Sequence, residues 1–208
     1  MQRLWFACGW LVAVAMSGSG GCSNAPSRIQ PSAIDASSAA SGAIQAYDKN
    51  ADGKLSKEEL SACPALLSAI SAYDANKDQS IDESEISARL QSWVDSGIGI
   101  SNAAFYLKLD GRPLPNAKVT LDPEPFLGDA VKPASGLSDQ TGRVGPTLPQ
   151  DQLPQGIRFG LLSGLYKVRV SHPAIASAAK YGDHTMLGIE VPPQFDVYNP
   201  PTLELTNR

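Results

Sequence analysis

The spacing of hydrophobic residues along this chain changes near residue 96. Before it, apolar residues recur every three or four positions, which is the period of amphipathic helices. Pro64 predicts a break near Cys63, because proline disfavours helix at the preceding residue and suits the first turn of a new one. We therefore expect helices before the first loop described below, two short helices between the loops, and one after the second. The apolar groups are Ala39, Ala40, Ala43, Ile44 and Tyr47; Leu60, Leu66, Leu67, Ile70 and Tyr73; and Ile86, Leu90, Trp93 and Val94.

Short runs of alternating apolar and polar residues follow residue 102, and turn residues separate them. Alternation with a period of two is typical of half-buried strands. We therefore expect an antiparallel β-sandwich over residues 100–208, so that the fold is a two-domain arrangement, α then all-β. The stretch 145–160 is rich in proline and glutamine, and the pattern leaves open whether it holds a strand or a long loop. The expected strands are Phe105–Leu109, Ala117–Leu121, Leu165–Val170, Leu187–Val191 and Leu203–Leu205.

Two acidic runs of twelve residues, 48–59 and 74–85, lie within the helical part. In each run oxygen-bearing side chains stand at positions 1, 3, 5, 9 and 12, and position 7 offers its backbone carbonyl. Calcium is a hard cation that prefers about six to eight oxygen ligands, which such loops supply. Lys54 contributes only its carbonyl, so its positive side chain can point away. The expected ligands are Asp48, Asn50, Asp52, Lys54, Ser56 and Glu59, and then Asp74, Asn76, Asp78, Ser80, Asp82 and Glu85.

The residues between these ligands fit the same kind of loop. Gly53 at position 6 suits a sharp turn with positive φ. Gln79 stands there in the second loop, where a left-handed conformation costs roughly 1 kcal/mol. Leu55 and Ile81, both at position 8, suit the short strand that joins paired loops. The segment 36–96 resembles an EF-hand pair, a family of calcium sensors, buffers and extracellular calcium modules, and the resemblance implies Ca2+ as the cofactor.

Three motifs follow one another in the second half. A Gly-x-Pro-Leu turn that leads into a strand spans Gly111–Leu121, and a Ser-Asp-x-x-Gly turn spans Ser138–Gly142. A strand with the pattern Leu-x-x-Gly-x-Tyr-x-Val-x-Val spans Leu161–Val170. With them, residues 102–206 resemble the carboxypeptidase regulatory-like domain, a prealbumin-like (transthyretin-like) β-sandwich. Such domains are non-catalytic modules of surface and secreted proteins. The resemblance therefore implies an interaction domain with a protein or glycan partner at the cell envelope.

Residues 1–21 have the pattern of a secretory signal peptide. Arg3 gives a positive start, and Leu4–Met16 is an apolar run too short to span a bilayer. Gly20, Gly21 and Cys22 end it like a bacterial lipobox, in which the cysteine is lipidated, although Ser19 stands where an aliphatic residue is usual. We expect export and membrane anchoring through Cys22 in the bacterial cell envelope. Cleavage to a soluble, secreted or periplasmic product is the alternative.

Composition narrows the remaining possibilities. Ser23 to Ala40 has the composition of a flexible spacer, and the expected tether is 22–35. The formal charge of the 208-residue chain is −4 and no basic stripe occurs, so nucleic-acid binding is not expected. Cys8 leaves with the signal peptide and Cys22 is lipidated, so Cys63 remains as a thiol without a disulfide partner and is expected in the core.

No catalytic constellation stands out in the sequence. The chain lacks a Gly-x-Ser-x-Gly elbow, and its two histidines, His172 and His184, are too few for a His-rich metal centre. The leading hypothesis is a calcium-binding lipoprotein with a non-catalytic interaction domain. One alternative is an accessory or weak hydrolytic enzyme with a site in the loops 145–160 or 172–186. Another is a calcium-switched adaptor, which requires an exposed Met-rich face, yet all three methionines lie outside 36–96.

Overall fold

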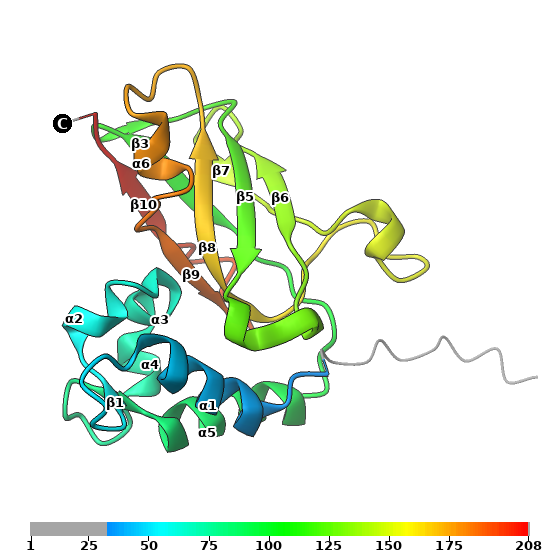
Figure 1. Ribbon diagram of the computed structural model, residues 1–208. Helices are drawn as coiled ribbons and strands as arrows, with labels where there is room; N and C mark the ends of the chain where they lie inside the picture. Colours follow the sequence, from blue (N-terminus) through cyan, green and yellow to red (C-terminus); the bar gives the residue numbers. More distant parts are fainter. Residues whose placement is uncertain (1–32, 208) are drawn as a thin grey trace, which may run out of the picture.

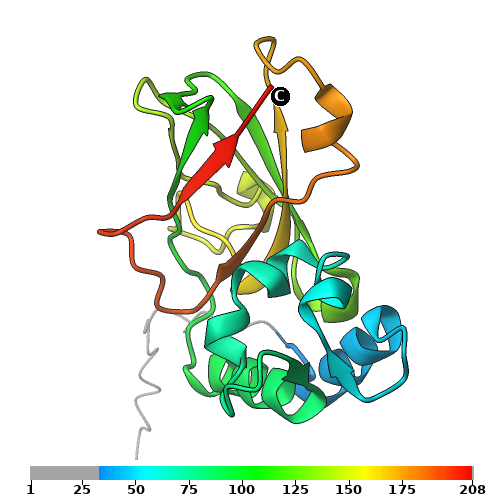
Figure 2. The same cartoon turned by 90° about the vertical axis from the view of Figure 1, so that its left-hand side faces the viewer.

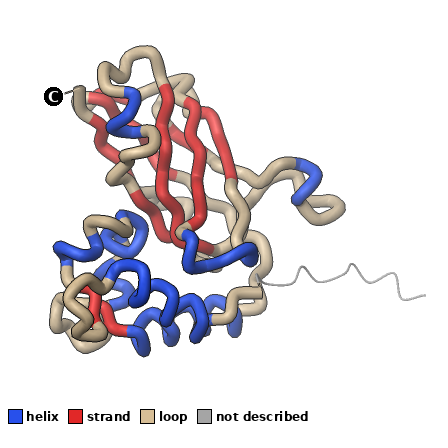
Figure 3. The backbone as a smooth tube through the Cα atoms, viewed as in Figure 1, coloured by secondary structure: helices blue, strands red, loops and turns tan. Residues whose placement is uncertain are grey.

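The computed structural model describes residues 33–207 of the chain. The predictions for the signal peptide 1–21, for Cys22 and for most of the tether fall outside this range. A helical part comes first and a β-rich part follows, as the hydrophobic pattern predicts (Figure 1). The helices of the first part gather at one end of the sandwich (Figure 3). None of the helices between residues 33 and 207 has the length and hydropathy needed to cross a bilayer.

Two longer helices frame the helical part. Helix α1 spans Ala36–Tyr47 and packs against α5, which spans Glu83–Asp95. Asp35 caps α1, and its carboxylate accepts a hydrogen bond of 2.9 Å from the amide of Ser38. Residues 36–40, which composition places in the spacer, are therefore the first turns of α1. Composition misleads here because small alanines, rather than large apolar residues, form the buried face: Ala36, Ala39, Ala40 and Ala43.

Three short helices connect the two acidic loops: α2 (Lys57–Leu60), α3 (Pro64–Ser68) and α4 (Ile70–Tyr73). The predicted break occurs where Cys63 precedes Pro64, at the first position of α3. A second break, which the sequence did not predict, lies at Ala69 with φ −108° and ψ 9°. It separates α3, which contacts strand β9, from α4, which contacts α5. Tertiary packing on two surfaces thus overrides the local helix propensity.

The sandwich consists of two four-stranded sheets. One has the order β6-β5-β8-β9, and the other has the order β10-β3-β4 with β7 also paired to β3. All pairs are antiparallel except β10 with β3, which run parallel. The strands are β3 Phe105–Leu109, β4 Arg112–Pro113, β5 Lys118–Pro123, β6 Ala134–Leu137, β7 Arg143–Val144, β8 Gly164–Ser171, β9 Gly188–Val191 and β10 Thr202–Leu205.

Each expected strand region contains an observed strand, and the differences lie in short elements. Strands β4, β6 and β7 carry little or no alternation and were not predicted, and neither was helix α6 (Ala178–Tyr181). The stretch 145–160 is a loop with one 3-10 turn, η2 (Gln150–Gln152). Gly142 has φ +80°, and a Cβ there would lie 2.4 Å from the Leu107 carbonyl oxygen, so the turn before β7 requires glycine.

The helical part packs directly on the sandwich, and buried residues of both parts form one core cluster. Figures 1 and 2 show the helical part beneath the strands from two directions. Helix α3 contacts β8 and β9, while α1 contacts the 3-10 helix η1 (Pro125–Ala130) that follows β5. Gly188 of β9 allows the closest approach, because a Cβ there would lie 2.2 Å from the Pro64 carbonyl carbon. The free thiol of Cys63 is fully buried nearby, as predicted for a core cysteine.

Candidate metal centre

The two acidic loops lie side by side and are joined by a two-stranded ribbon. Strands β1 (Lys54–Leu55) and β2 (Ile81–Asp82) pair antiparallel, with Leu55 opposite Ile81. Both of these side chains are fully buried. This is the arrangement expected from apolar residues at position 8 of each loop.

The backbones of the two loops follow the same path. At position 6, Gly53 has φ +81° and Gln79 has φ +69°, so glutamine adopts the conformation that glycine usually supplies. At position 4, Ala51 has φ +60° and Lys77 has φ +63°. The conformation at position 4 could not be predicted from the sequence, because neither alanine nor lysine favours the left-handed region. The two loops therefore share the same backbone conformation at positions 4 and 6, although the second loop lacks the glycine.

Loop amides point inward at the carboxylate in position 1. The two carboxylate oxygens of Asp48 accept hydrogen bonds from the amides of Ala51 (2.7 Å) and Gly53 (2.9 Å). Asp74 accepts from the amides of Asp78 (3.0 Å) and Gln79 (2.9 Å), so the amide at position 6 bonds the first carboxylate in both loops. These bonds hold each chain in a tight turn around its first acidic residue.

The glutamate in position 12 closes each loop and also caps the helix that follows. Glu59 accepts from the amides of Lys49 and Ser56, both at 2.9 Å, and Ser56 accepts in return from the Glu59 amide. Glu85 likewise bonds the amides of Ala75 (2.9 Å) and Asp82 (3.0 Å). Both glutamates are buried. Hydrogen bonds from the backbone and hydroxyl of Ser56 and from Lys49 lower the pKa of Glu59 to about 2.

Positions 3, 5 and 9 present further oxygens. Asn50 and Asp52 in the first loop, and Asn76 and Asp78 in the second, each accept a bond from an amide two residues ahead, at 2.8–3.0 Å. The Ser56 hydroxyl contacts Glu59 at 2.7 Å, and Asp82 accepts from the Ser84 hydroxyl at 2.6 Å. The predicted ligands of each run therefore line one small loop.

The side chain of Lys54, which is free to point away from the ligands of its own loop, reaches the second loop. Its ammonium group forms an ion pair with the carboxylate of Asp78, a predicted ligand of the other loop. The reason is geometric: β1 and β2 pair in register, which brings position 7 of the first loop close to the second loop. Sequence spacing within one loop cannot reveal such a contact.

The donor set fits a hard cation. Within residues 33–207, no three acidic, cysteine or histidine side chains converge on one point as the side chains stand. Each loop instead combines carboxylates with amide, hydroxyl and carbonyl oxygens, and contains neither sulfur nor imidazole. The backbone turns that such a loop requires are formed. An ion in the first loop would be held by Asp48, Asn50, Asp52, the Lys54 carbonyl, Ser56 and Glu59.

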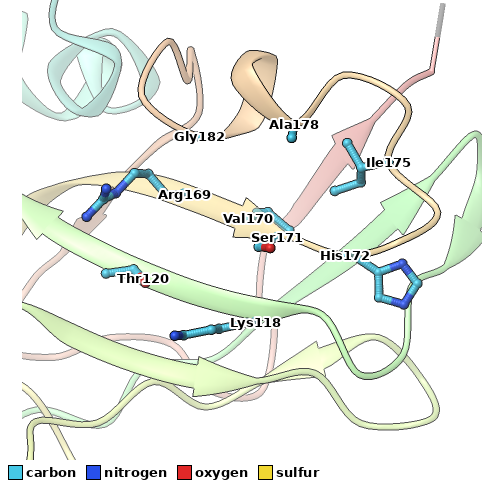
Figure 4. A pocket seen from close by; sticks show the side chains of 9 residues that line it. All are labelled: Lys118, Thr120, Arg169, Val170, Ser171, His172, Ile175, Ala178 and Gly182. Carbon is cyan, nitrogen blue, oxygen red and sulfur yellow. The ribbon is translucent and has the colours of Figure 1, made fainter.

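The sandwich also has surface clefts in or beside the loops named by the enzyme alternative. One has a volume of about 450 Å3 and lies over β5, β8 and α6 (Figure 4). Arg169 lies in this cleft and already contacts Asp122 and Asp183. A second cleft of about 340 Å3 lies beside Phe159. His184 is exposed, and His172 lines the first cleft.

The comparison with known protein families agrees with the geometry of the first loop. The family model for the EF hand matches residues 42–64, which include the end of α1, the whole first loop and α2. The match supports calcium as the ligand. No curated protein and no solved structure matches the chain.

Proposed function

We propose that this chain is an exported calcium-binding lipoprotein, in which an EF-hand pair is fixed to a non-catalytic β-sandwich that recognises a partner at the cell envelope. The observation that carries the calcium role is the pair of loops with matching backbone turns, joined through Leu55 and Ile81. The EF-hand match covers the first loop. The second loop is included because its turns and amide bonds repeat those of the first.

A structural or slowly regulatory role for calcium is favoured over a switched adaptor. Extracellular calcium modules have dissociation constants of about 0.1–1 mM, far above the range of cytosolic sensors. A sensor opens a Met-rich groove, and the helical part contains no methionine. Its helices α1 and α3 instead rest on the sandwich. Calcium bound here would hold this packed arrangement together.

The non-catalytic role of the sandwich rests on the side chains that line its clefts. Catalysis of hydrolysis requires a nucleophile beside a base, or a base beside a bound water. In the cleft over β5, β8 and α6, His172 accepts a hydrogen bond from the amide of Ala174, which occupies one ring nitrogen. The guanidinium of Arg169 is engaged by two carboxylates. These contacts favour a recognition surface over a reaction centre.

Membrane anchoring is proposed from the sequence alone, through lipidation of Cys22 after the Gly20-Gly21 dipeptide. Mass spectrometry of the mature N-terminus tests it. We expect an acylated Cys22 as the first residue. An unmodified N-terminus at any other residue would replace the anchor with a soluble, exported product.

Calorimetric titration of residues 23–208 with calcium tests the metal-binding role. We expect two binding events per chain, and a much weaker response to magnesium, because the smaller ion demands a rigid octahedral site. A titration of well-folded protein without any heat of binding would contradict the proposal. A single binding event would restrict the proposal to one loop. That loop is the one whose variant, Glu59→Gln or Glu85→Gln, abolishes the event.

A further inference from the structure

Each candidate calcium loop has a side chain nearby that contacts a glutamate of the sandwich, one fully buried (Glu124) and one mostly buried (Glu190). Tyr47 immediately precedes Asp48, the first residue of the first loop, and its hydroxyl donates to Glu124 Oε2 at 3.0 Å. Arg89 follows Glu85, the last residue of the second loop, by one helical turn, and its Nε donates to Glu190 Oε1 at 2.9 Å. Neither glutamate belongs to the helical part.

The environment of Glu124 makes its few contacts important. The residue is completely buried, and its Oε1 has no hydrogen-bond partner within the described residues. The Lys167 ammonium, 3.6 Å away, the Tyr47 hydroxyl and the Cys63 thiol stabilise its charge. Burial raises the pKa of Glu124, which reflects the cost of removing the carboxylate from water. Loss of the Tyr47 hydroxyl would leave this buried carboxylate with Lys167 and the weakly donating thiol, and would weaken the contact between the two parts.

Tyr47 is also held by its ring, so its position fixes the end of α1. The ring packs edge-on against Phe126 of η1, with centroids 6.2 Å apart and an interplanar angle of 86°. Beyond the first loop, Cys63 and Pro64 lead into α3, whose start lies against Gly188. The helices on both sides of the first loop are thus attached to the sandwich. Asp48 and Glu59 must both reach the same ion. The distance between them depends on where these attachments hold the two helices.

The second loop is attached through α5. Arg89 is about one-third exposed and Glu190 is only 10% exposed. Burial raises the pKa of Glu190, and Arg89 opposes this rise. Burial raises the pKa of Tyr73, which immediately precedes Asp74, and the charge of Glu190 adds to the rise. The Tyr73 hydroxyl has no hydrogen-bond partner among the described residues, so the second loop is attached to its glutamate through Arg89 rather than through the tyrosine.

We propose that Glu124 and Glu190 are positioning residues for the two calcium loops, acting through Tyr47 and Arg89. This inference rests on the proposed calcium-binding function. Preorganised ligands bind more tightly because less conformational freedom is lost on binding. Coupling between sites is reciprocal. If the contact between the helices and the sandwich raises calcium affinity by some factor, bound calcium must stabilise that contact by the same factor. The EF-hand pair and the sandwich form one calcium-binding unit.

The test is calcium titration of residues 23–208, which include every described element, in a Glu85→Gln background that isolates the first loop. Tyr47→Phe removes one hydroxyl and keeps the ring on Phe126. Tyr181→Phe is the matched control, because it removes a hydroxyl bonded to Thr206 in the sandwich. We expect Tyr47→Phe to weaken calcium binding about five- to tenfold, and Tyr181→Phe to change it less than about twofold.

Conservative rescue separates positioning from general stability. Glu124→Gln keeps an acceptor for the Tyr47 hydroxyl. We therefore expect it to reduce calcium affinity less than Tyr47→Phe does, when both are compared with the Glu85→Gln background. Arg89→Met in a Glu59→Gln background should weaken the second loop by a similar factor. All titrations are made well below the melting temperature, where every variant is folded. Equal affinities for Tyr47→Phe and Tyr181→Phe would overturn the inference and leave the calcium function intact. Absence of calcium binding in the wild type would overturn both.

Discussion

Lys54 in the first loop forms an ion pair with Asp78 in the second, so the ammonium group holds a carboxylate that a calcium ion would also need. The Lys54 carbonyl, rather than its side chain, is the predicted ligand. Substitution of the side chain therefore leaves the donor set of the first loop unchanged. The contact is a direct electrostatic link between the two loops.

Lys54→Met should strengthen calcium binding in the second loop. An exposed ion pair is worth about 0.2–1 kcal/mol, so removal of the competing ammonium should raise affinity by at most about fivefold. The measurement is calorimetry in a Glu59→Gln background, which isolates the second loop. Lys57→Met removes the same charge from an exposed position nearby and is the control. A decrease in affinity, or an increase equal to that of the control, would show that Lys54 does not compete with the ion.

Gly188→Ala should destabilise the whole chain, because the new Cβ would lie 2.2 Å from backbone atoms of Pro64 and Ala65. Overpacking of this kind costs about 1–3 kcal/mol. Gly145→Ala is the control, since nothing lies within 4 Å of a Cβ at that position. Urea denaturation compares the free energies of unfolding. Equal values for the two variants would mean that α3 does not rest on β9 as closely as described.

The sequence predicts this fold well where the signal is local. Pro64 predicts a helix break, and Leu55 and Ile81 predict the ribbon between the loops. Both features can be predicted because they depend on residues that are close together in the sequence. The parallel pairing of β10 with β3 joins residues about a hundred positions apart, and no local pattern encodes it. The burial of Glu124 is similarly hidden, since a glutamate after a strand usually indicates a solvated turn. The attachment of the loops to the sandwich could therefore be found only in three dimensions.

The calcium-free protein should lose stability in acid partly through Glu59. Its pKa of about 2 lies below its ordinary value of 4.5. A depressed pKa contributes stability that is fully present above the unfolded value and is lost as the pH falls through the folded value. The difference in free energy of unfolding between wild type and Glu59→Gln should therefore shrink as the pH falls from about 5 toward 2. Urea denaturation at several pH values measures it.

Glu58→Gln serves as the control for that series, because Glu58 is the exposed neighbour of Glu59 and lies outside the ligand set. Its difference from wild type should vary much less over the same range. A difference for Glu59→Gln that stays constant with pH would indicate that the Ser56 and Lys49 hydrogen bonds do not hold the carboxylate in its charged form.

Calcium-dependent melting of residues 23–208 tests the central claim most directly. At tenfold excess over the dissociation constant each independent site adds about 1.4 kcal/mol, so two sites should raise the melting temperature by roughly 6–10 °C over chelator. Glu59→Gln and Glu85→Gln should each remove part of this rise, and Glu59→Gln the larger part, because the first loop has the intact Gly53 turn. A larger loss from Glu85→Gln would reverse the ranking of the loops. Identical melting of the wild type in calcium and in chelator would contradict the account.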